Sequence, residues 1–493
     1  MAEKSYKQIV KSTSIIGASQ SIQILVKIIG TKSISVFIGP TGIGLLGILQ
    51  STLDLIGMIV GMGLGSSAVY DISVANKDNN IQKSSRMIRI LMRLVFITGL
   101  LGSFFTFFLS NQISIWVFGN SDQAANFKIL AVVIFINQIY TGSQAVLNGY
   151  RRIKELAYIS VIGGVIILIF TVPAYYFFKQ MAIMPSILFS AIIYLLVSLY
   201  YTKKIKVISV PVSLTDVRDY GKGMLKFGFV SMIIGIFILL STYQLRLLVN
   251  SKLGLFYVGI YQAGWGLTAS YVQLIFQSMS RDLSPRLNIA IDSKEEANKL
   301  VNEQLHITIL ISIPILASML LLSSSLIHIL YSPEFYEAVS LLQWLLFGTI
   351  LRIFSRPLAL MLYSARLTKL YLISELFPTI LLLIISYLLI DDYGLNAIGI
   401  AYTLSYILYN IFIYITTNVR LTFTFDSMSI KCMIVSSIGI FFVFFLKYTQ
   451  QSQISIIINT LLCILLGCWS FYYLDKLLGI RGIIRNMKKK YFR

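Results

Sequence analysis

The sequence predicts an all-α protein that crosses a membrane many times. Three observations predict this class: 57% of the 493 residues are hydrophobic, only 12% are charged, and long apolar runs recur along the whole chain. A soluble protein carries about 25% charged residues, which cover its water-facing surface. Half that share leaves too little polar surface, so we expect a polytopic membrane protein.

The apolar runs divide into fourteen candidate membrane spans, twelve followed by a further two, because a hydrocarbon core of about 30 Å needs roughly 20 apolar residues per helix. In chain order they cover residues 12–37, 42–72, 87–109, 125–148, 157–177, 183–202, 224–249, 256–283, 303–329, 338–362, 370–390, 395–417, 432–447 and 454–474. The thirteenth candidate is short. If the last two candidates do not cross the membrane, the number of spans is twelve.

The basic residues predict the orientation of these spans. Most of the 41 Lys and Arg residues fall on one side of the membrane if both termini are cytoplasmic, as the positive-inside rule requires. The same distribution explains the net charge of +21, because such residues set topology and contact anionic lipid headgroups. The interleaved basic and aromatic residues of a soluble nucleic-acid-binding surface are missing.

An internal repeat explains a stretch that looks like a nucleotide site. FIGPTGIGLLG at 37–47 has the G-x-G-x-x-G spacing of dinucleotide-binding loops. Shifting the chain by 215 residues places Gly39 and Gly44 on Gly254 and Gly259, whereas the other two glycines of the pattern are lost. A pyrophosphate loop needs them for close backbone approach. We therefore interpret the repeated glycines as residues of two outer hairpins and of close helix contacts.

The repeat also predicts the domain organisation. Two halves of six spans with the same orientation would be related by a pseudo-two-fold axis along the membrane normal, with a central cavity between them. We expect a first lobe at 1–202, a cytoplasmic linker at 203–223, a second lobe at 224–417, and an additional pair of spans with a basic cytoplasmic tail at 418–493. Gly57 and Gly61 either let one helix bend during transport or let it pack closely.

Charged residues within the spans are the first candidates for a site, because an ion in the membrane usually faces a cavity or a partner. Lys32 and Arg246 coincide within one residue under the repeat. Facing each other across a cavity, they would suit a pyrophosphate; the alternative is that both reach the headgroups. Arg352 is expected to line the cavity, and Arg356 to reach the headgroups.

Lys27 and Asp54 are predicted to lie at similar depth on neighbouring spans and to pair. The pair would either fix helix packing or couple transport to protons through Asp54. His306 and His328 stand near opposite ends of one span, where an interfacial position is expected.

Five stretches carry a family resemblance over roughly residues 10–420: FIGPTGIGLLG at 37–47, FGNSDQAANFKILAVV at 118–133, VGIYQ at 258–262, YVQ with a later LSP at 271–285, and FYEAVSLLQWLLFG at 335–348. In these the chain resembles the Wzx-type lipid-linked oligosaccharide flippases, which belong to the multidrug/oligosaccharidyl-lipid/polysaccharide exporter superfamily. The resemblance implies a V-shaped fold and alternating access in the bacterial inner membrane. The cargo would be an undecaprenyl-pyrophosphate-linked glycan such as an O-antigen unit, moved to the outer leaflet.

Roles for particular residues complete the expectation. The substrate cavity would use Lys32, Arg246, Lys27 and Arg352 for the pyrophosphate. Tyr261 and Gln262 within VGIYQ, together with Gln50, are candidates for sugar contacts. Anionic lipids and other polysaccharide-assembly membrane proteins are the expected partners, with no nucleic acid.

The pattern of polar residues favours a transporter over an enzyme. The chain has neither a Ser/His/Asp or Cys/His arrangement nor a carboxylate cluster that could hold a metal, so we expect no catalysis, metal or cofactor. Without an ATP-binding motif, the membrane potential or an ion gradient must drive transport. The alternatives are a multidrug antiporter of the same superfamily and a membrane-embedded glycan polymerase or ligase.

Overall fold

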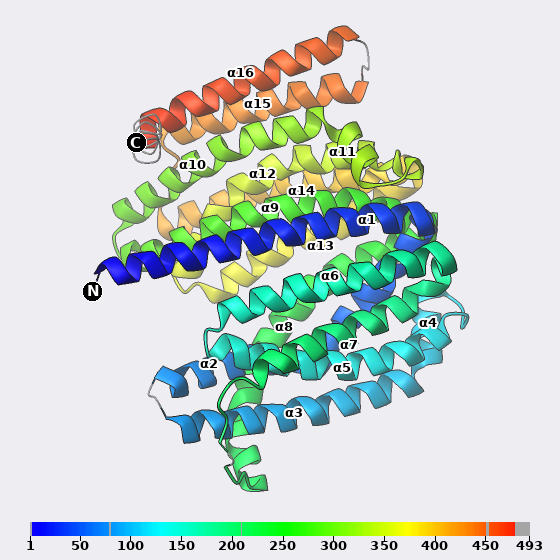
Figure 1. Cartoon of the computed structure of the whole chain (residues 1–493). Helices are drawn as coiled ribbons and strands as arrows, with labels where there is room; N and C mark the ends of the chain where they lie inside the picture. Colours follow the sequence, from blue (N-terminus) through cyan, green and yellow to red (C-terminus); the bar gives the residue numbers. More distant parts are fainter. Residues whose placement is uncertain (1, 78–79, 209, 450–452, 479–493) are drawn as a thin grey trace, which may run out of the picture. The chain divides into compact units, whose positions relative to one another are not determined.

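The computed structural model describes residues 2–77, 80–208, 210–449 and 453–478, and every regular element in them is a helix (Figure 1). The all-α class is therefore confirmed. The chain divides into two compact units, Met1–Gly259 and Ile260–Arg493. The boundary lies within α9, whereas the repeat predicted lobes that meet at a linker at 203–223.

The first unit holds α1 (Ala2–Gly61), α2 (Leu64–Lys77), α3 (Ile81–Phe108), α4 (Ser110–Phe118), α5 (Ala124–Gly149), α6 (Ile153–Phe178), the 3₁₀ turn η1 (Lys179–Ala182), α7 (Ile183–Thr202), α8 (Leu214–Leu253) and the start of α9 (Leu255–Ala290). The second holds the rest of α9, then α10 (Lys294–Leu321), α11 (Ser323–Leu330), the 3₁₀ turn η2 (Pro333–Phe335), α12 (Ala338–Ser364), α13 (Thr368–Tyr393), α14 (Asn396–Leu421), α15 (Ser427–Thr449) and α16 (Gln453–Leu478).

Helix α1 is two helices joined at a backbone break. Gly39 has φ 63° and ψ −173°, and Pro40 follows it. Positive φ is readily adopted by glycine, and proline is favoured in the first turn of a helix. The break therefore falls between the expected spans 12–37 and 42–72. The second of these spans is itself interrupted at Met62 and Gly63, which both have positive φ.

Ten helical stretches of the described residues are long and apolar enough to cross a membrane. Two of the ten contain backbone breaks: Ile22–Gly61 is interrupted at Gly39, and Ile153–Thr202 contains the turn η1. Helices α8 and α9, of 40 and 36 residues, are additional to these ten. The molecule is thus a multi-pass membrane protein by length and composition, and the count of fourteen spans stays a prediction.

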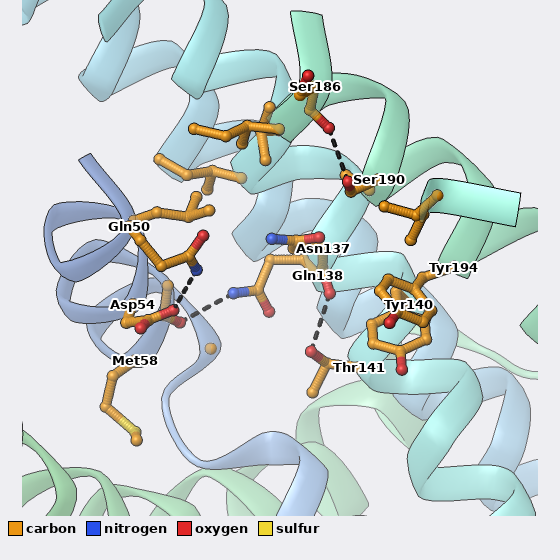
Figure 2. A pocket seen from close by; sticks show the side chains of 18 of the residues that line it. Gln50, Asp54, Met58, Asn137, Gln138, Tyr140, Thr141, Ser186, Ser190 and Tyr194 are labelled. Atoms are coloured by element: carbon orange, nitrogen blue, oxygen red, sulfur yellow. Dashed lines mark hydrogen bonds between the residues drawn. The ribbon is translucent and has the colours of Figure 1, made fainter. Parts of the chain in front are cut away.

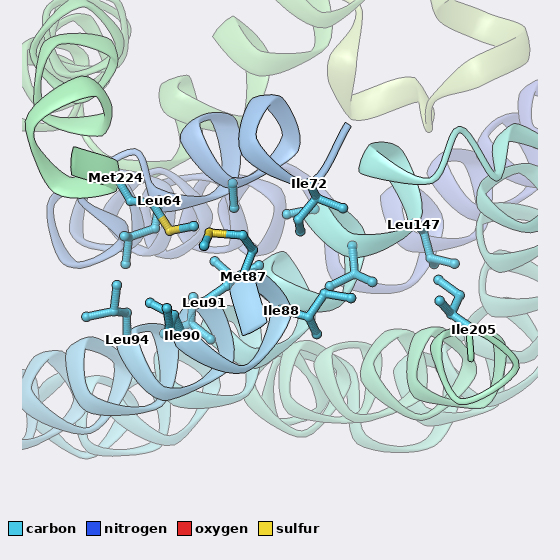
Figure 3. Close-up of a cluster of buried hydrophobic side chains, with 14 of the residues drawn as sticks. Leu64, Ile72, Met87, Ile88, Ile90, Leu91, Leu94, Leu147, Ile205 and Met224 are labelled. Carbon is cyan, nitrogen blue, oxygen red and sulfur yellow. The ribbon is translucent and has the colours of Figure 1, made fainter. Parts of the chain in front are cut away.

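The first unit is built around α5, which packs against α2, α3 and α7. At one end of this bundle, apolar side chains from α2, α3 and α5 form a buried cluster (Figure 3). Ile72, Leu91 and Leu147 are fully buried there. Ile159 of α6, Ile205 from the segment after α7, and Met224 of α8 complete the cluster, so one core joins five helices and this segment.

The segment between α7 and α8 is shorter than the expected linker, because α8 begins at Leu214. Two arginines of α3 hold this segment by its backbone. Arg89 Nη1 donates to the Val210 carbonyl and Arg93 Nη1 to the Val212 carbonyl, each at 2.8 Å. Val210 and Val212 of the connection are therefore held against α3.

The second unit is built around α12, the most buried of the candidate spans, which packs against α10, α13, α14 and α15. The additional pair α15 and α16 lies along α10 (Figure 1). Aromatic rings join the pair to α12: the Phe444 ring lies 4.7 Å from Trp344 and 5.1 Å from Phe347, measured between centroids. The last two spans are thus an integral part of this unit.

His306 lies inside the second unit rather than at the interface expected from its place near a span end. It is 5% exposed, and its Nε2 is 2.9 Å from both Asp426 Oδ1 and Ser429 Oγ. Because the Ser429 hydroxyl donates to Asn302 Oδ1, His306 must supply the proton on Nε2. Asn302 also donates to the Thr424 carbonyl, so α10 binds the loop between α14 and α15. We name these contacts the loop clasp.

Candidate functional site

The first unit contains a pocket of about 800 Å³. Its lining comes from α1, the start of α2, α5, α6 and α7, with Leu239 from α8. Figure 2 shows Gln138 between Asp54 on one side and Tyr140 and Tyr194 on the other. A pocket of this size in a helix bundle, with a few converging polar groups, is typical of a small-molecule site.

Asp54 and Gln50 form one side of the pocket from a single face of α1, one helical turn apart. Gln50 Nε2 donates to Asp54 Oδ1 at 2.9 Å. The charge of Arg246, on α8, acts on Asp54. Lys27, the expected partner, is exposed on the first half of α1 and is not in the pocket lining, so its pairing with Asp54 stays a prediction.

Arg246 is held against α1 by its own hydrogen bond. Its Nη1 donates to Ser51 Oγ at 2.6 Å, and its buried Nε has no partner among the described residues. One turn before Arg246 on α8, the Tyr243 hydroxyl lies 3.0 Å from the hydroxyl of Thr52 on α1. These contacts fix the face of α8 that carries Arg246 beside the helix that carries Asp54.

The middle of the pocket is formed by amide side chains of α5. Gln138 Nε2 donates to the Gly57 carbonyl at 2.9 Å, while its buried Oε1 has no partner among the described residues. A methyl group on Gly61 would lie 3.4 Å from this amide, and one on Gly99 would lie 2.9 Å from Gln138 Cβ. Glycines of two neighbouring helices therefore make room for the glutamine.

The far side of the pocket is aromatic. The Tyr140 and Tyr194 rings lie 5.8 Å apart at 36°, and Gln144 Nε2 donates to the Tyr140 hydroxyl at 3.1 Å. Gly163 of α6 leaves space for the Tyr194 ring, which a methyl group there would approach to 2.7 Å. The pocket thus offers a carboxylate, amides and aromatic faces.

The repeated glycines bring two turns of the first unit together. A methyl group on Gly44 would overlap the Leu255 carbonyl, and one on Gly259 would overlap the Pro40 carbonyl. Gly254 has φ 92° and ends α8. The glycines in corresponding positions of the repeat therefore allow backbone-to-backbone contact.

Two arginines of α12 lie inside the second unit. The Arg352 guanidinium lies 4.9 Å from the Phe276 ring centroid and 5.9 Å from that of Tyr406. Arg356, expected to reach the headgroups, pairs instead with Glu375 of α13, with 2.7 Å between Nη1 and Oε1. Aromatic faces and a carboxylate stabilise these two guanidinium groups within the unit.

The other predicted residues lie elsewhere. Lys27 is exposed and Lys32 is partly buried, both on the first half of α1 and neither in the pocket lining. Tyr261 is fully buried, with its ring 5.8 Å from that of Trp265. Gln262 is partly buried beside it. Gln50 and Asp54, with the glycines Gly57 and Gly61, are thus the predicted site residues that the pocket unites.

Sequence reasoning missed the amides and tyrosines of the pocket, although a signal was present. Asn137, Tyr140, Thr141 and Gln144 stand at positions i, i+3, i+4 and i+7 of an otherwise apolar helix, which places them on one face. Polar residues on one face of a membrane helix point to a cavity. Glu375 was missed as well, although it is an acidic residue within a candidate span.

No group of three His, Cys, Asp or Glu residues that could hold a metal ion occurs within the described part of the chain. The loop clasp also lacks the geometry of a hydrolytic triad. Both Asp426 and Ser429 contact Nε2 of His306, whereas a triad places the carboxylate on Nδ1 and the serine on Nε2.

Comparisons with known proteins point to transporters. The lipid III flippases of Escherichia coli (strain K12) and Shigella flexneri are each 23% identical to this chain over 404 residues, which is 80% of this chain and 94% of theirs. These relatives are named as flippases, in agreement with the expectation that the chain is not an enzyme.

Two solved structures share the fold of this chain. A multidrug resistance MATE family transporter of the MOP superfamily, in an inward-facing conformation, has a TM-score of 0.70 at 15% identity, covering 81% of this chain and 94% of its own. The lipid II flippase MurJ, in an inward closed conformation, has a TM-score of 0.69 at 14% identity, covering 95% and 99%. The second match must include most of residues 418–493.

The family model of polysaccharide biosynthesis proteins matches residues 35–340, more than half of the chain. With the relatives above, this match confirms the resemblance to flippases of the exporter superfamily. The chain is a member of the polysaccharide biosynthesis protein family.

Proposed function

We propose that this protein is a flippase for a lipid-linked glycan. The observation that carries the proposal is the match to lipid III flippases over 80% of this chain and 94% of theirs, together with the family match. The cargo we propose is an undecaprenyl-pyrophosphate-linked oligosaccharide, an O-antigen or related surface polysaccharide unit. It is moved from the inner to the outer leaflet of the bacterial inner membrane.

The physical problem is the headgroup. A pyrophosphate with several sugars cannot cross hydrocarbon alone, because an unpaired ion there costs tens of kcal/mol by Born estimates. We propose that Lys32, Arg246, Lys27 and Arg352 supply positive charge along its path. Arg246 is the best supported of the four, because its buried Nε has no partner in the described part of the chain and an arginine can bind a phosphate through two nitrogens.

Asp54 is our candidate for coupling to an ion gradient. Its carboxylate attracts the Arg246 guanidinium, so protonation of Asp54 would remove that attraction and favour binding of a phosphate oxygen by Arg246. Ionisable groups within membrane spans commonly serve as such relays. The membrane potential would add about 5 kcal/mol per 100 mV for a cargo of charge about −2 moving outward, since each charge contributes about 2.3 kcal/mol.

Transport would proceed by alternating access. Two six-helix halves in fourteen spans, with both termini in the cytoplasm, would expose the headgroup to each side in turn while the prenyl tail stays in lipid. Gly39 and Gly254, with φ of 63° and 92°, mark the turns that join the long helices of each half.

The proposal is tested by the double substitution Lys32→Ala with Arg246→Ala. We expect loss of surface glycan in cells, with unchanged protein level in the membrane, because the pyrophosphate loses its counter-charges. Lys203→Ala with Lys204→Ala, at exposed positions after α7, is the matched control and should export normally. Normal surface glycan in the Lys32/Arg246 variant would contradict the cationic path.

A multidrug antiporter is the second candidate. The pocket of the first unit has one carboxylate, Asp54, and no Lys or Arg among its described lining residues, which would also suit a cationic drug. Expression in a drug-sensitive strain would test this. Raised resistance to cationic drugs that is lost in Asp54→Asn, with no effect on glycan export, would favour that candidate.

A further inference from the structure

The amide groups at the centre of the first unit's pocket are not explained by pyrophosphate binding. The backbone carbonyl of Asn137 accepts a hydrogen bond from Thr141 Oγ1 at 2.8 Å. The side-chain amide of Asn137 points into the pocket (Figure 2). Gln138 is 4% exposed, and its Oε1 accepts no hydrogen bond from the described residues. A buried acceptor without a donor is costly, so this pocket is suited to a ligand that donates hydrogen bonds.

The aromatic side adds a second property. Tyr140 and Tyr194 both line this side of the pocket, with their rings next to each other. Tyrosine combines a large apolar face with a polar tip. A sugar ring is complementary to such a surface, because its C–H face is apolar and its hydroxyl groups lie around the edge.

The charge of the pocket excludes the pyrophosphate part of the cargo. Asp54 is its carboxylate, and no Lys or Arg occurs among the described lining residues. A phosphate anion would find no counter-charge there and would be repelled by Asp54. The volume of about 800 Å³ is far more than a single ion needs and lies in the usual range for small-molecule ligands.

We infer that this pocket is a sugar subsite, which binds uncharged, hydroxyl-rich units of the glycan through Asn137, Gln138, Tyr140 and Tyr194. The inference rests on the proposed function and deepens it: the pyrophosphate is held by the basic residues, and the sugars are selected by amides and aromatic rings. Specificity arises because a hydroxyl group that satisfies Gln138 Oε1 binds better than a sugar that leaves it unpaired.

The test uses competition by free sugar. The purified protein is reconstituted in vesicles with the lipid-linked glycan extracted from a strain that lacks this transporter. The same glycan, released from its lipid by mild acid, is then added as a competitor without lipid or pyrophosphate. We expect it to slow flipping by the wild type, and Asn137→Ala to need at least tenfold more glycan for the same inhibition.

Asn148→Ala on the same helix, where the side chain is exposed and bonds only the Gln144 carbonyl one turn away, is the matched control and should behave as wild type. Asn137→Ser replaces the alanine variant if that variant does not flip lipid. Equal inhibition of the wild type and the Asn137 variant, or no inhibition of the wild type, would overturn the subsite while flipping itself stands. A wild type that flips no lipid-linked glycan would instead overturn the proposed function, and the subsite with it.

Discussion

Gly44 and Gly57 belong to the same helix, yet their surroundings are opposite. A methyl group on Gly44 would overlap the Leu255 carbonyl, whereas one on Gly57 would meet no atom within 4 Å. Glycine is therefore required at position 44 by a backbone contact. At position 57 no packing contact that the structure describes requires glycine, and the residue lines the pocket; bending of the helix stays a prediction.

These surroundings predict opposite effects of alanine at the two positions. Gly44→Ala should destabilise the protein by about 1–3 kcal/mol, as overpacking typically does. Gly57→Ala should be neutral or stabilising by up to about 1 kcal/mol, because alanine is the better helix former. Thermal unfolding in detergent measures both, and equal melting temperatures for the two variants would contradict this account. If Gly57→Ala also keeps full flipping activity, a bend at this position is not needed.

At the same scale, the sequence identified single residues better than it identified their partners. Asp54 and Gln50 were predicted as site residues, and both line the pocket. The charge of Arg246 acts on Asp54, which the sequence did not predict, because depth along a span says nothing about which face a side chain occupies. Such pairings depend on how helices are rotated about their axes, and packing of the whole unit determines that rotation.

At the scale of elements, the sequence predicted most helices but not their interruptions. The turns at Gly39 and Gly254 were expected from the repeat and are present. The break at Met62 and Gly63 was not placed, although the glycines around it were noted. A methyl group on Gly63 would overlap the Gly228 carbonyl of α8. That break is therefore tied to a tertiary contact, which local propensity does not encode.

The loop clasp makes the stability of the second unit depend on pH. Burial acts to raise the pKa of Asp426, but hydrogen bonds from Ser429 and His306 outweigh it and hold the pKa below its ordinary value of 3.8. A carboxyl group whose pKa is lowered on folding stabilises the protein above its unfolded pKa, and this contribution is lost as pH falls through the folded value.

We therefore expect Asp426→Asn to lower the melting temperature at pH 7. The difference from wild type should begin to shrink below about pH 4 and disappear once the pH is below the lowered pKa of the folded state. Asp292→Asn, at an exposed position before α10, is the control and should melt as wild type throughout. A melting-temperature difference for Asp426→Asn that persists unchanged into acid would show that the charge of this carboxylate is not what binds the loop.

At the scale of the whole molecule, orientation is the strongest expectation that composition provides. Basic residues between the spans predict cytoplasmic termini, and the same rule assigns each loop to one side. The loop 119–123 is expected outside and the loop 291–293 inside.

Cysteine labelling in intact cells would test it. In a background with Cys432, Cys463 and Cys468 replaced by alanine, a membrane-impermeant thiol reagent should label Ser121→Cys. It should label Asp292→Cys only after the membrane is opened, because that loop faces the cytoplasm. The reverse pattern would invert the topology, and labelling of both sites in intact cells would contradict the number of spans between them.

The contacts from Arg89 and Arg93 to the backbone before α8 have a mechanical consequence. The second contact is made to Val212 and α8 begins at Leu214, so a single residue separates the anchored backbone from the helix. This end of α8 therefore cannot move far from α3. If α8 changes position during a transport cycle, it can pivot about this anchored end, and its opposite end, which carries Arg246, would then sweep the wider arc.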